Sequence, residues 1–443
     1  MNKTPEQKSL EEINASVKVP SVYEDSLVRK FIAYSGPGAL VAVGYMDPGN
    51  WLTSLSGGSQ FKYQLLSVLL ISILVAMFMQ MLSIKLGITT QQDLAQAIAS
   101  RVSRPVRYVL WILNEIAMMA TDMTGVVGTA IALNLLFKIP LIFGVILTIF
   151  DVLVVLVFLR FGIKRIEWIV LIGILIVGLI FGIEVFRANP NWTAIWNGVL
   201  PTSKVLTNHT MLALSLGIVG ATIMPHNLYL HSSLAQSRRY DYNDPKQVTE
   251  ALHFANWDSN THLVLALIIN ALLLILGGTL FYHTKGNLMT FQDVFNGLKD
   301  PVLVGHLASP LMSWLFALAL LITGLISSIS STLAGQIVME GYLHIRWPLW
   351  KRRLVTRLAT LVPIFIICII FGFNEAIFSN IIVYAQIALS IALPFSLFPL
   401  IHLTSQSQVV DEHVNSKLTT IVGYLLVIII TLLNLQLIWV TIA

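Results

Sequence analysis

The sequence predicts an all-α polytopic membrane protein. Hydrophobic residues make up 56% of its 443 residues, whereas charged residues make up 11%, and the mean hydropathy is +0.79. A soluble domain carries roughly 25% charged residues, and a soluble core of this size could not bury so much apolar surface. Several apolar stretches are also long enough to cross a bilayer, which takes about 20 residues. Together these observations exclude a single soluble enzyme.

Eleven membrane spans are expected after a polar amino-terminal tail. They lie at 33–58, 64–86, 108–136, 139–160, 166–187, 209–234, 260–284, 309–340, 354–373, 376–402 and 417–441. The expected domains are a cytoplasmic tail (1–32), a first transmembrane repeat (33–187), an extracellular loop (188–208), a second repeat (209–402), and a cytoplasmic loop with the eleventh span (403–443). The single cysteine, Cys368, excludes an intrachain disulfide framework and a cysteine-based zinc site.

The distribution of lysine and arginine predicts the orientation. With the amino terminus in the cytoplasm, 21 of the 27 basic residues fall on the cytoplasmic side of these spans. Cytoplasmic loops are enriched in lysine and arginine in membrane proteins. We therefore expect a multi-pass protein of the cell membrane with a cytoplasmic amino terminus and an extracellular carboxyl terminus.

Two spans are interrupted by proline near the middle of the membrane. The first contains Asp47-Pro48-Gly-Asn50, and the sixth contains Met224-Pro225-His-Asn. Proline removes a helix hydrogen bond and clashes with the preceding turn. Because the two spans are five apart, they run in opposite directions, which predicts an inverted 5+5 repeat plus an eleventh helix. Unwound backbone at this depth can form an ion site near the midplane.

The side chains at these breaks indicate the kind of ion. They offer the carboxylate of Asp47, the amide oxygen of Asn50 and the thioether of Met224, and Ala221 can add a freed carbonyl. Oxygen ligands alone suit calcium or magnesium. A thioether is a soft ligand, which favours transition metals and cadmium over calcium. The pattern therefore predicts a site for a divalent transition metal that the protein transports, and not one that it keeps as a cofactor.

Several motifs resemble those of a known family. Beside the two proline motifs, they are Gly-Gly-Ser-Gln-Phe (57–61), Ala-Thr-Asp (120–122), Ile-Glu-Val-Phe (183–186), Ser-Thr-Leu-Ala-Gly-Gln-Ile-Val-Met-Glu-Gly (331–341) and Leu-Pro-Phe (393–395). With them the sequence resembles the Nramp family of proton-coupled divalent metal transporters and its bacterial MntH-like members. The resemblance implies a LeuT-like fold, alternating access, and metal ligation by Asp47, Asn50, Met224 and the Ala221 carbonyl. It also implies that Gln386 approaches the ion in some conformational states.

Ionisable residues within the spans suggest a proton pathway. Glu115 and Asp122 lie seven residues apart, on one face of the third span. Acids inside a membrane span are functional candidates by default, and Arg352 and Arg353 are their expected partners. The resemblance implies that this network is a proton exit route.

Two histidines of the sixth span are further candidates for this pathway. His226 and His231 can relay protons because histidine titrates near neutral pH. For His231, packing against a polar neighbour is an equal alternative. Asp47 itself belongs to the expected pathway as its starting point.

One position departs from the family pattern. An Asp-x-x-Glu motif is usual, but here Gly125 follows Asp122 at that spacing. The missing carboxylate should loosen coupling to protons. From the ligand set and the resemblance, the expected function is a secondary transporter that imports manganese and iron, and also cadmium and cobalt, with proton symport. The alternatives are a weakly coupled or uncoupled, channel-like carrier, and a LeuT-fold carrier of another substrate. The sequence contains no motif typical of a membrane-embedded hydrolase, so that alternative is not favoured. We expect no resident cofactor, no nucleic-acid partner and no obligate protein partner.

Overall fold

The computed structural model is helical almost throughout. It describes residues 9–21, 26–151, 153, 157, 162–282, 290–304 and 308–442. Within these residues, nine helices are long and apolar enough to cross a membrane. Two predicted spans are not among the nine. The first is divided into short helices, and much of the second half of the span at 139–160 lies outside the described residues.

The first half of the chain contains one of the two interrupted spans. Its elements are β1 (Val17–Lys18), α1 (Leu27–Tyr34), α2 (Pro37–Gly44), α3 (Pro48–Phe61), α4 (Leu66–Thr90), α5 (Leu94–Ala99), α6 (Arg104–Phe137), α7 (Leu141–Leu147), η1 (Thr148–Phe150), α9 (Ile163–Ala188), α10 (Trp192–Val199) and α11 (Lys204–Thr207). The helices α4, α6 and α9 are uninterrupted over 25, 34 and 26 residues.

The second half begins with the other interrupted span. Its elements are α12 (His209–Thr222), α13 (Pro225–Leu234), η2 (Ala235–Ser237), β2 (Arg238–Arg239), α14 (Pro245–Leu280), α15 (Phe291–Gly297), α16 (Pro301–Val304), α17 (Pro310–Leu343), α18 (Leu349–Phe371), α19 (Glu375–Ala392), α20 (Pro394–Thr404), α21 (Ser407–Val410), η4 (Asp411–His413) and α22 (Lys417–Ile442). Proline at 394 divides the tenth span, although Leu393 keeps helical dihedrals (φ −60°, ψ −48°).

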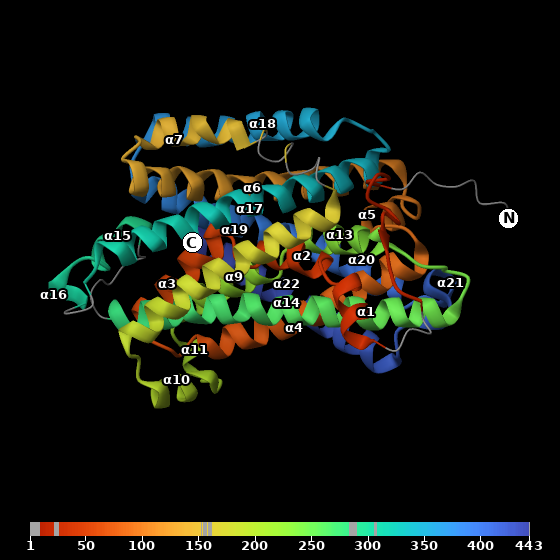
Figure 1. The fold of residues 1–443 in the computed structure, drawn as a ribbon, viewed down its shortest axis with the longest axis horizontal. Helices are drawn as coiled ribbons and strands as arrows, with labels where there is room; N and C mark the ends of the chain where they lie inside the picture. Colours follow the sequence, from red (N-terminus) through yellow and green to blue (C-terminus); the bar gives the residue numbers. More distant parts are fainter. Residues whose placement is uncertain are drawn as a thin grey trace.

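The long helices run along the longest axis of the molecule (Figure 1). The short helices α5 and α21 lie at one end of this axis, and α10, α15 and α16 lie at the other. The chain runs from α1 to α3 in one direction and from α11 to α13 in the opposite direction. α17 packs along α6, and α14 packs along α3. The interrupted helices are therefore enclosed by continuous ones.

The first span is broken twice, once more than expected. Gly36, between α1 and α2, has a φ of +138°, which L side chains rarely adopt. The carboxylate of Asp258 on α14 accepts the backbone N–H groups of Gly36 (2.9 Å) and Gly38 (2.7 Å). These bonds satisfy donors at the start of α2 that have no partner within the helix. The second break, between α2 and α3, is the predicted one at Asp47-Pro48.

The amino-terminal segment, expected as a soluble tail, packs against the helices in its described part. Leu10 is 7% exposed, and its backbone N–H donates to Glu340 of α17 at 2.9 Å. Strand β1 pairs in parallel with β2, with Val17 opposite Arg238. Because β2 closely follows α13, the segment joins the end of the second interrupted span to α17.

Candidate metal site between two interrupted helices

The first half of the site is the break between α2 and α3. Pro48 starts α3, where its missing N–H would have no partner within the helix. Asp47 is the N-cap of α3, with extended dihedrals (φ −65°, ψ 164°), and its Oδ1 accepts the backbone N–H of Asn50 at 2.9 Å. The carboxylate is completely buried. The sequence Asp-Pro-Gly-Asn thus ends one helix, starts another and presents a buried anion between them.

The second half is the break between α12 and α13. Ile223 (φ −97°, ψ 92°) and Met224 (φ −103°, ψ 132°) are extended, and Pro225 starts α13. Met224 is 1% exposed and belongs to a cluster with Ala117 and Ala385. The extended residues release backbone groups that a continuous helix would pair.

Asn50 joins the two breaks. Its Nδ2 donates to Asp47 Oδ1 at 2.7 Å and to the carbonyl oxygen of Ala221 at 2.8 Å. Gln386 Nε2 of α19 donates to Asp47 Oδ2 at 3.3 Å. A Cβ added at Gly49 would lie 1.8 Å from that nitrogen, so a side chain at 49 would displace Gln386. Four of the five predicted ligands therefore form one hydrogen-bonded group, and Met224 lies at the second break.

Thr124 is a site residue that the sequence analysis missed. Its hydroxyl donates to Asp47 Oδ2 at 3.1 Å, and it is completely buried on α6. A signal was present, because Thr121, Thr124 and Gly128 recur at three- and four-residue spacing, which marks one face of a helix. Among the described residues, no three histidine, cysteine, aspartate or glutamate side chains gather as a metal cluster. The candidate site thus depends on one carboxylate supported by neutral groups.

The two histidines of α13 contact different helices. His226 Nδ1 lies 3.2 Å from the hydroxyl of Thr121 on α6, and its Nε2 has no hydrogen-bond partner among the described residues. His231 Nδ1 lies 2.9 Å from Gln80 Oε1 on α4, and Gln80 in turn donates to the hydroxyl of Tyr45 at 2.9 Å. His226 therefore adjoins α6, the helix whose Thr124 contacts Asp47, whereas His231 has the polar neighbour that its packing alternative requires.

The four charged residues expected to interact are paired. Arg352 Nη2 donates to the two carboxylate oxygens of Glu115 at 2.6 and 2.7 Å. Arg353 Nη1 donates to Asp122 Oδ1 at 2.6 Å. Arg353 and Asp122 are 2% and 4% exposed, so this pair lies inside the protein. Whether these pairs carry protons remains a prediction.

The cluster is larger than the sequence indicated. Arg357 Nη1 lies 3.2 Å from Asp122 Oδ2. Asp151 Oδ2 accepts from Arg353 Nη2 at 2.8 Å, from the hydroxyl of Ser328 at 2.5 Å, and from Arg357. Two acids and two arginines thus form a buried, electrically balanced group. Opposite charges in this arrangement offset the high cost of burying each one alone.

Gly125 follows Asp122 by three residues on α6 and faces α17. The nearest atom to a Cβ added there would be the carbonyl oxygen of Gly324, 4.0 Å away. The preceding residue, Thr124, instead points toward Asp47. Within the described residues, no hydrogen bond joins Asp47 directly to Asp122.

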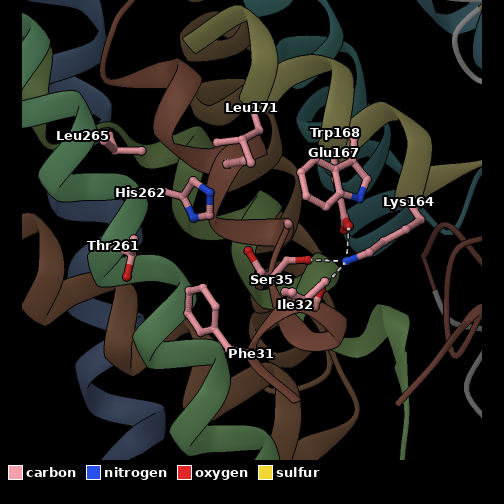
Figure 2. A pocket seen from close by; sticks show the side chains of 12 residues that line it. Phe31, Ile32, Ser35, Lys164, Glu167, Trp168, Leu171, Thr261, His262 and Leu265 are labelled. Atoms are coloured by element: carbon pink, nitrogen blue, oxygen red, sulfur yellow. Dashed lines mark hydrogen bonds and ion pairs between the residues drawn. The ribbon is translucent and has the colours of Figure 1, made fainter. Parts of the chain in front are cut away.

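A pocket lies apart from this site, beside the break between α1 and α2 (Figure 2). Phe31 and Trp168 line it, and Lys164 reaches across the end of α1. Lys164 Nζ donates to the carbonyl oxygens of Ile32 at 3.0 Å and Ser35 at 2.5 Å. These bonds satisfy carbonyls at the end of α1. None of the described residues lining this pocket is a predicted site residue, so we treat it as separate.

The architecture defines the class of protein first. Mhp1, a nucleobase-cation-symport-1 family transporter, is only 12% identical but superposes with a TM-score of 0.59 over 96% of this chain and 93% of its own. At this identity the likeness concerns the fold alone. With the helical composition and the apolar spans, it confirms the predicted class, an all-α polytopic membrane protein with a LeuT-like fold.

Closer relatives then give the family. Residues 38–440 match the family model "Natural resistance-associated macrophage protein-like". The "Divalent metal cation transporter MntH" of Levilactobacillus brevis is 49% identical, covering 98% of this chain and 94% of the relative. The manganese transporter of Eremococcus coleocola, solved in complex with an aromatic bis-isothiourea substituted compound, is 43% identical with a TM-score of 0.92, covering 97% and 90% of the two chains. The chain belongs to the Nramp family, whose members are transporters and not enzymes.

Proposed function

We propose that this chain imports divalent manganese across the cell membrane as a secondary transporter. The observation that carries the proposal is the Asn50 amide, which donates to both Asp47 and Ala221 across the two breaks. A cation bound there would meet the same two oxygens and replace the amide hydrogens. Turning the amide over would then present Asn50 Oδ1 as a third oxygen ligand. The names of the relatives, a divalent metal cation transporter and a manganese transporter, support this cargo.

Met224 supports a transition metal over calcium or magnesium. Its thioether is soft, and it lies at the break that also supplies the Ala221 carbonyl. The same ligand chemistry suits iron, cobalt and cadmium, which we include in the proposed range of cargo. Gln386 would complete the ligand set by moving from Asp47 to the cation. In this proposal the metal is substrate, and the protein needs no resident cofactor, nucleic acid or obligate protein partner.

Alternating access and proton symport complete the proposal. Repeats 33–187 and 209–402 would move against each other around the site, with the amino terminus in the cytoplasm and the carboxyl terminus outside. Protons would leave Asp47 past His226, which adjoins Thr121 on α6, and continue to the pairs Asp122–Arg353 and Glu115–Arg352. His231 would contribute on the opposite side of α13, facing α4.

A second candidate is a metal carrier that moves few protons or none. Two observations favour it: Gly125 stands where the family usually has an acid, and Asp47 has no direct hydrogen bond to Asp122 among the described residues. The two candidates differ in whether a proton accompanies each metal ion, and not in the metal ligands.

Uptake into proteoliposomes separates these candidates. The purified protein is reconstituted, and uptake of manganese, iron, cadmium, calcium and magnesium is measured together with the signal of an internal pH dye. Manganese uptake with acidification of the lumen supports symport, whereas uptake without acidification supports the uncoupled carrier. Equal uptake of calcium and manganese, or no uptake of any metal, would contradict the proposed cargo.

A further inference from the structure

The hydroxyl of Thr124 lies between a metal-site carboxylate and its own helix. Its single hydrogen is shared between two acceptors, Asp47 Oδ2 at 3.1 Å and the carbonyl oxygen of Thr121 at 2.7 Å. A buried threonine in a helix ordinarily satisfies its hydroxyl with a backbone carbonyl of its own helix alone. Thr323 of α17 is an example, because its hydroxyl bonds the Ala319 carbonyl of its own helix at 2.8 Å. The contact with Asp47, 77 residues away, is therefore additional to what the helix requires.

The two oxygens of Asp47 have different partners. Oδ1 accepts from the backbone and side-chain nitrogens of Asn50, at 2.9 and 2.7 Å. Oδ2 accepts from Thr124 at 3.1 Å and from Gln386 at 3.3 Å. If the Asn50 amide turns over for a cation, Oδ1 of Asp47 loses its side-chain donor and is free to bind the cation. If Gln386 also turns toward the cation, the contact with Thr124 is left to hold Oδ2.

The backbone of α6 is also fixed against this part of the site. A Cβ added at Gly128, one turn beyond Thr124, would lie 2.3 Å from Cγ of Pro48, the residue that follows Asp47. The ring of Pro48 at the start of α3 therefore packs directly against the backbone of α6 at Gly128. This contact holds Thr124 at a constant position relative to the carboxylate.

We propose that Thr124 is a positioning residue of the metal site, which holds Oδ2 of Asp47 so that Oδ1 faces the cation. The inference depends on the proposed metal site and adds a residue to it from α6. It assigns one-oxygen ligation to Asp47, with the second oxygen kept by the hydroxyl. A carboxylate without this donor would rotate, and the cation would meet a less ordered ligand.

The test compares three variants of the full-length protein. Thr124→Val keeps the branched shape and removes the hydroxyl, Thr124→Ser keeps the hydroxyl, and Thr323→Val is the matched control in α17. Manganese affinity is measured by calorimetry in detergent, and KM and maximal rate are measured in proteoliposomes. Because Thr124→Val loses a hydrogen bond to a charged group, we expect it to raise Kd and KM by about tenfold or more. Thr124→Ser and Thr323→Val should keep wild-type affinity.

Two outcomes would overturn the inference. One is wild-type Kd and KM in Thr124→Val, and the other is an equal loss of affinity in Thr124→Val and Thr124→Ser. Thr124→Ala, which cannot overpack, replaces the valine variant if that protein does not fold. Asp47→Ala, measured in parallel, separates this failure from a failure of the proposed site. If Asp47→Ala abolishes binding while Thr124→Val binds normally, only the role of Thr124 is wrong.

Discussion

The side-chain amide of Asn50 donates to the backbone carbonyl of Ala221 at 2.8 Å, joining positions 171 residues apart. The first residue lies in α3 and the second in α12, so this bond crosses between the two interrupted helices. The same amide also bonds Asp47. A cation that displaced the amide hydrogens would therefore act on both helices at once. This relationship makes cargo binding and the relative position of the helices interdependent in our account.

Met224→Ala should change which metals are carried. The variant keeps the oxygen ligands but loses the soft one, so we expect weaker manganese and cadmium transport and greater tolerance of calcium and magnesium. Removing a buried methionine side chain also destabilises a protein by about 2–5 kcal/mol. Met339→Ala, at a methionine of α17 that is 3% exposed, controls for this general effect. Metal-panel uptake in which Met224→Ala still discriminates manganese from calcium as the wild type does would show that the thioether is not the selectivity element.

Asp122→Asn should stop proton movement and weaken the fold. It removes the anion that faces Arg353 and Arg357, and breaking a buried ion pair costs about 3–5 kcal/mol. The remaining anion, Asp151, keeps part of the cluster neutral, so we expect the low end of that range. Denaturant unfolding in detergent measures stability, and the internal pH dye measures proton flux.

The control for Asp122→Asn is the exposed pair between Glu11 and Arg346. These groups are separated by 2.7 Å, but the two side chains are 69% and 42% exposed. Glu11→Gln should change stability by less than about 1 kcal/mol, because water screens such pairs. Strong proton flux that survives Asp122→Asn would mean that protons take another route, for which His226 is the nearest candidate.

Gly125→Glu should strengthen coupling between protons and metal. It restores the acid that the family usually has one turn after Asp122, and each ionisable group along the route lowers the cost of moving a proton through apolar surroundings. The nearest atom to a new Cβ would be 4.0 Å away, so the first carbon fits. We expect more acidification per manganese ion than in the wild type. Gly125→Ala, which adds the carbon without the charge, should show no gain, and an equal gain in both variants would refute the electrostatic explanation.

Asp93 should make stability depend on pH outside the membrane spans. It caps α5, where its carboxylate accepts the backbone N–H of Gln96 at 2.9 Å. Burial raises its pKa to about 6, and the charge of Glu340 adds a smaller increase. The hydrogen bonds that the carboxylate accepts lower its pKa and offset part of this effect. Since the ordinary pKa of aspartate is about 3.9, the folded state binds a proton at Asp93 more tightly than the unfolded state does. This proton binding adds to the free energy of unfolding below about pH 4, and the contribution is lost as the pH rises through 6. The loss amounts to about 3 kcal/mol.

The matched variant for Asp93 is Asp93→Asn. Asparagine can still cap the helix but does not titrate, so the variant should unfold at a higher temperature than the wild type at pH 7.5 and lack the wild-type decline between pH 4 and 6. Thermal unfolding in detergent across this range measures the effect. An identical decline in both proteins would assign the pH dependence to other groups.

Local chemistry made the two central breaks predictable. Asp47-Pro48 and Met224-Pro225 interrupt helices because proline lacks a donor, and this depends on neighbouring residues alone. The structure starts α3 at Pro48 and α13 at Pro225. The break at Gly36 was missed, since its conformation depends on the distant carboxylate of Asp258.

Partners brought together by packing were harder to infer. Glu115 and Asp122 could be matched with Arg352 and Arg353, because charged residues in apolar spans need opposite charges. The enlargement of that cluster by Arg357 and Asp151 depends on how α18 lies beside η1 and α6, which no local pattern specifies. Thr124 was overlooked although it shares a helix face with Thr121 and Gly128, because a helical threonine can satisfy its hydroxyl within its own turn and the spacing does not identify a distant partner.

Calorimetric titration of manganese into the wild type and Asp47→Ala tests the central claim most directly. The account places a single side-chain anion among the proposed ligands, between two interrupted helices. It predicts heat of binding in the wild type and none in Asp47→Ala, with both proteins eluting as the same folded species in detergent. Manganese binding to Asp47→Ala at wild-type affinity would contradict the account.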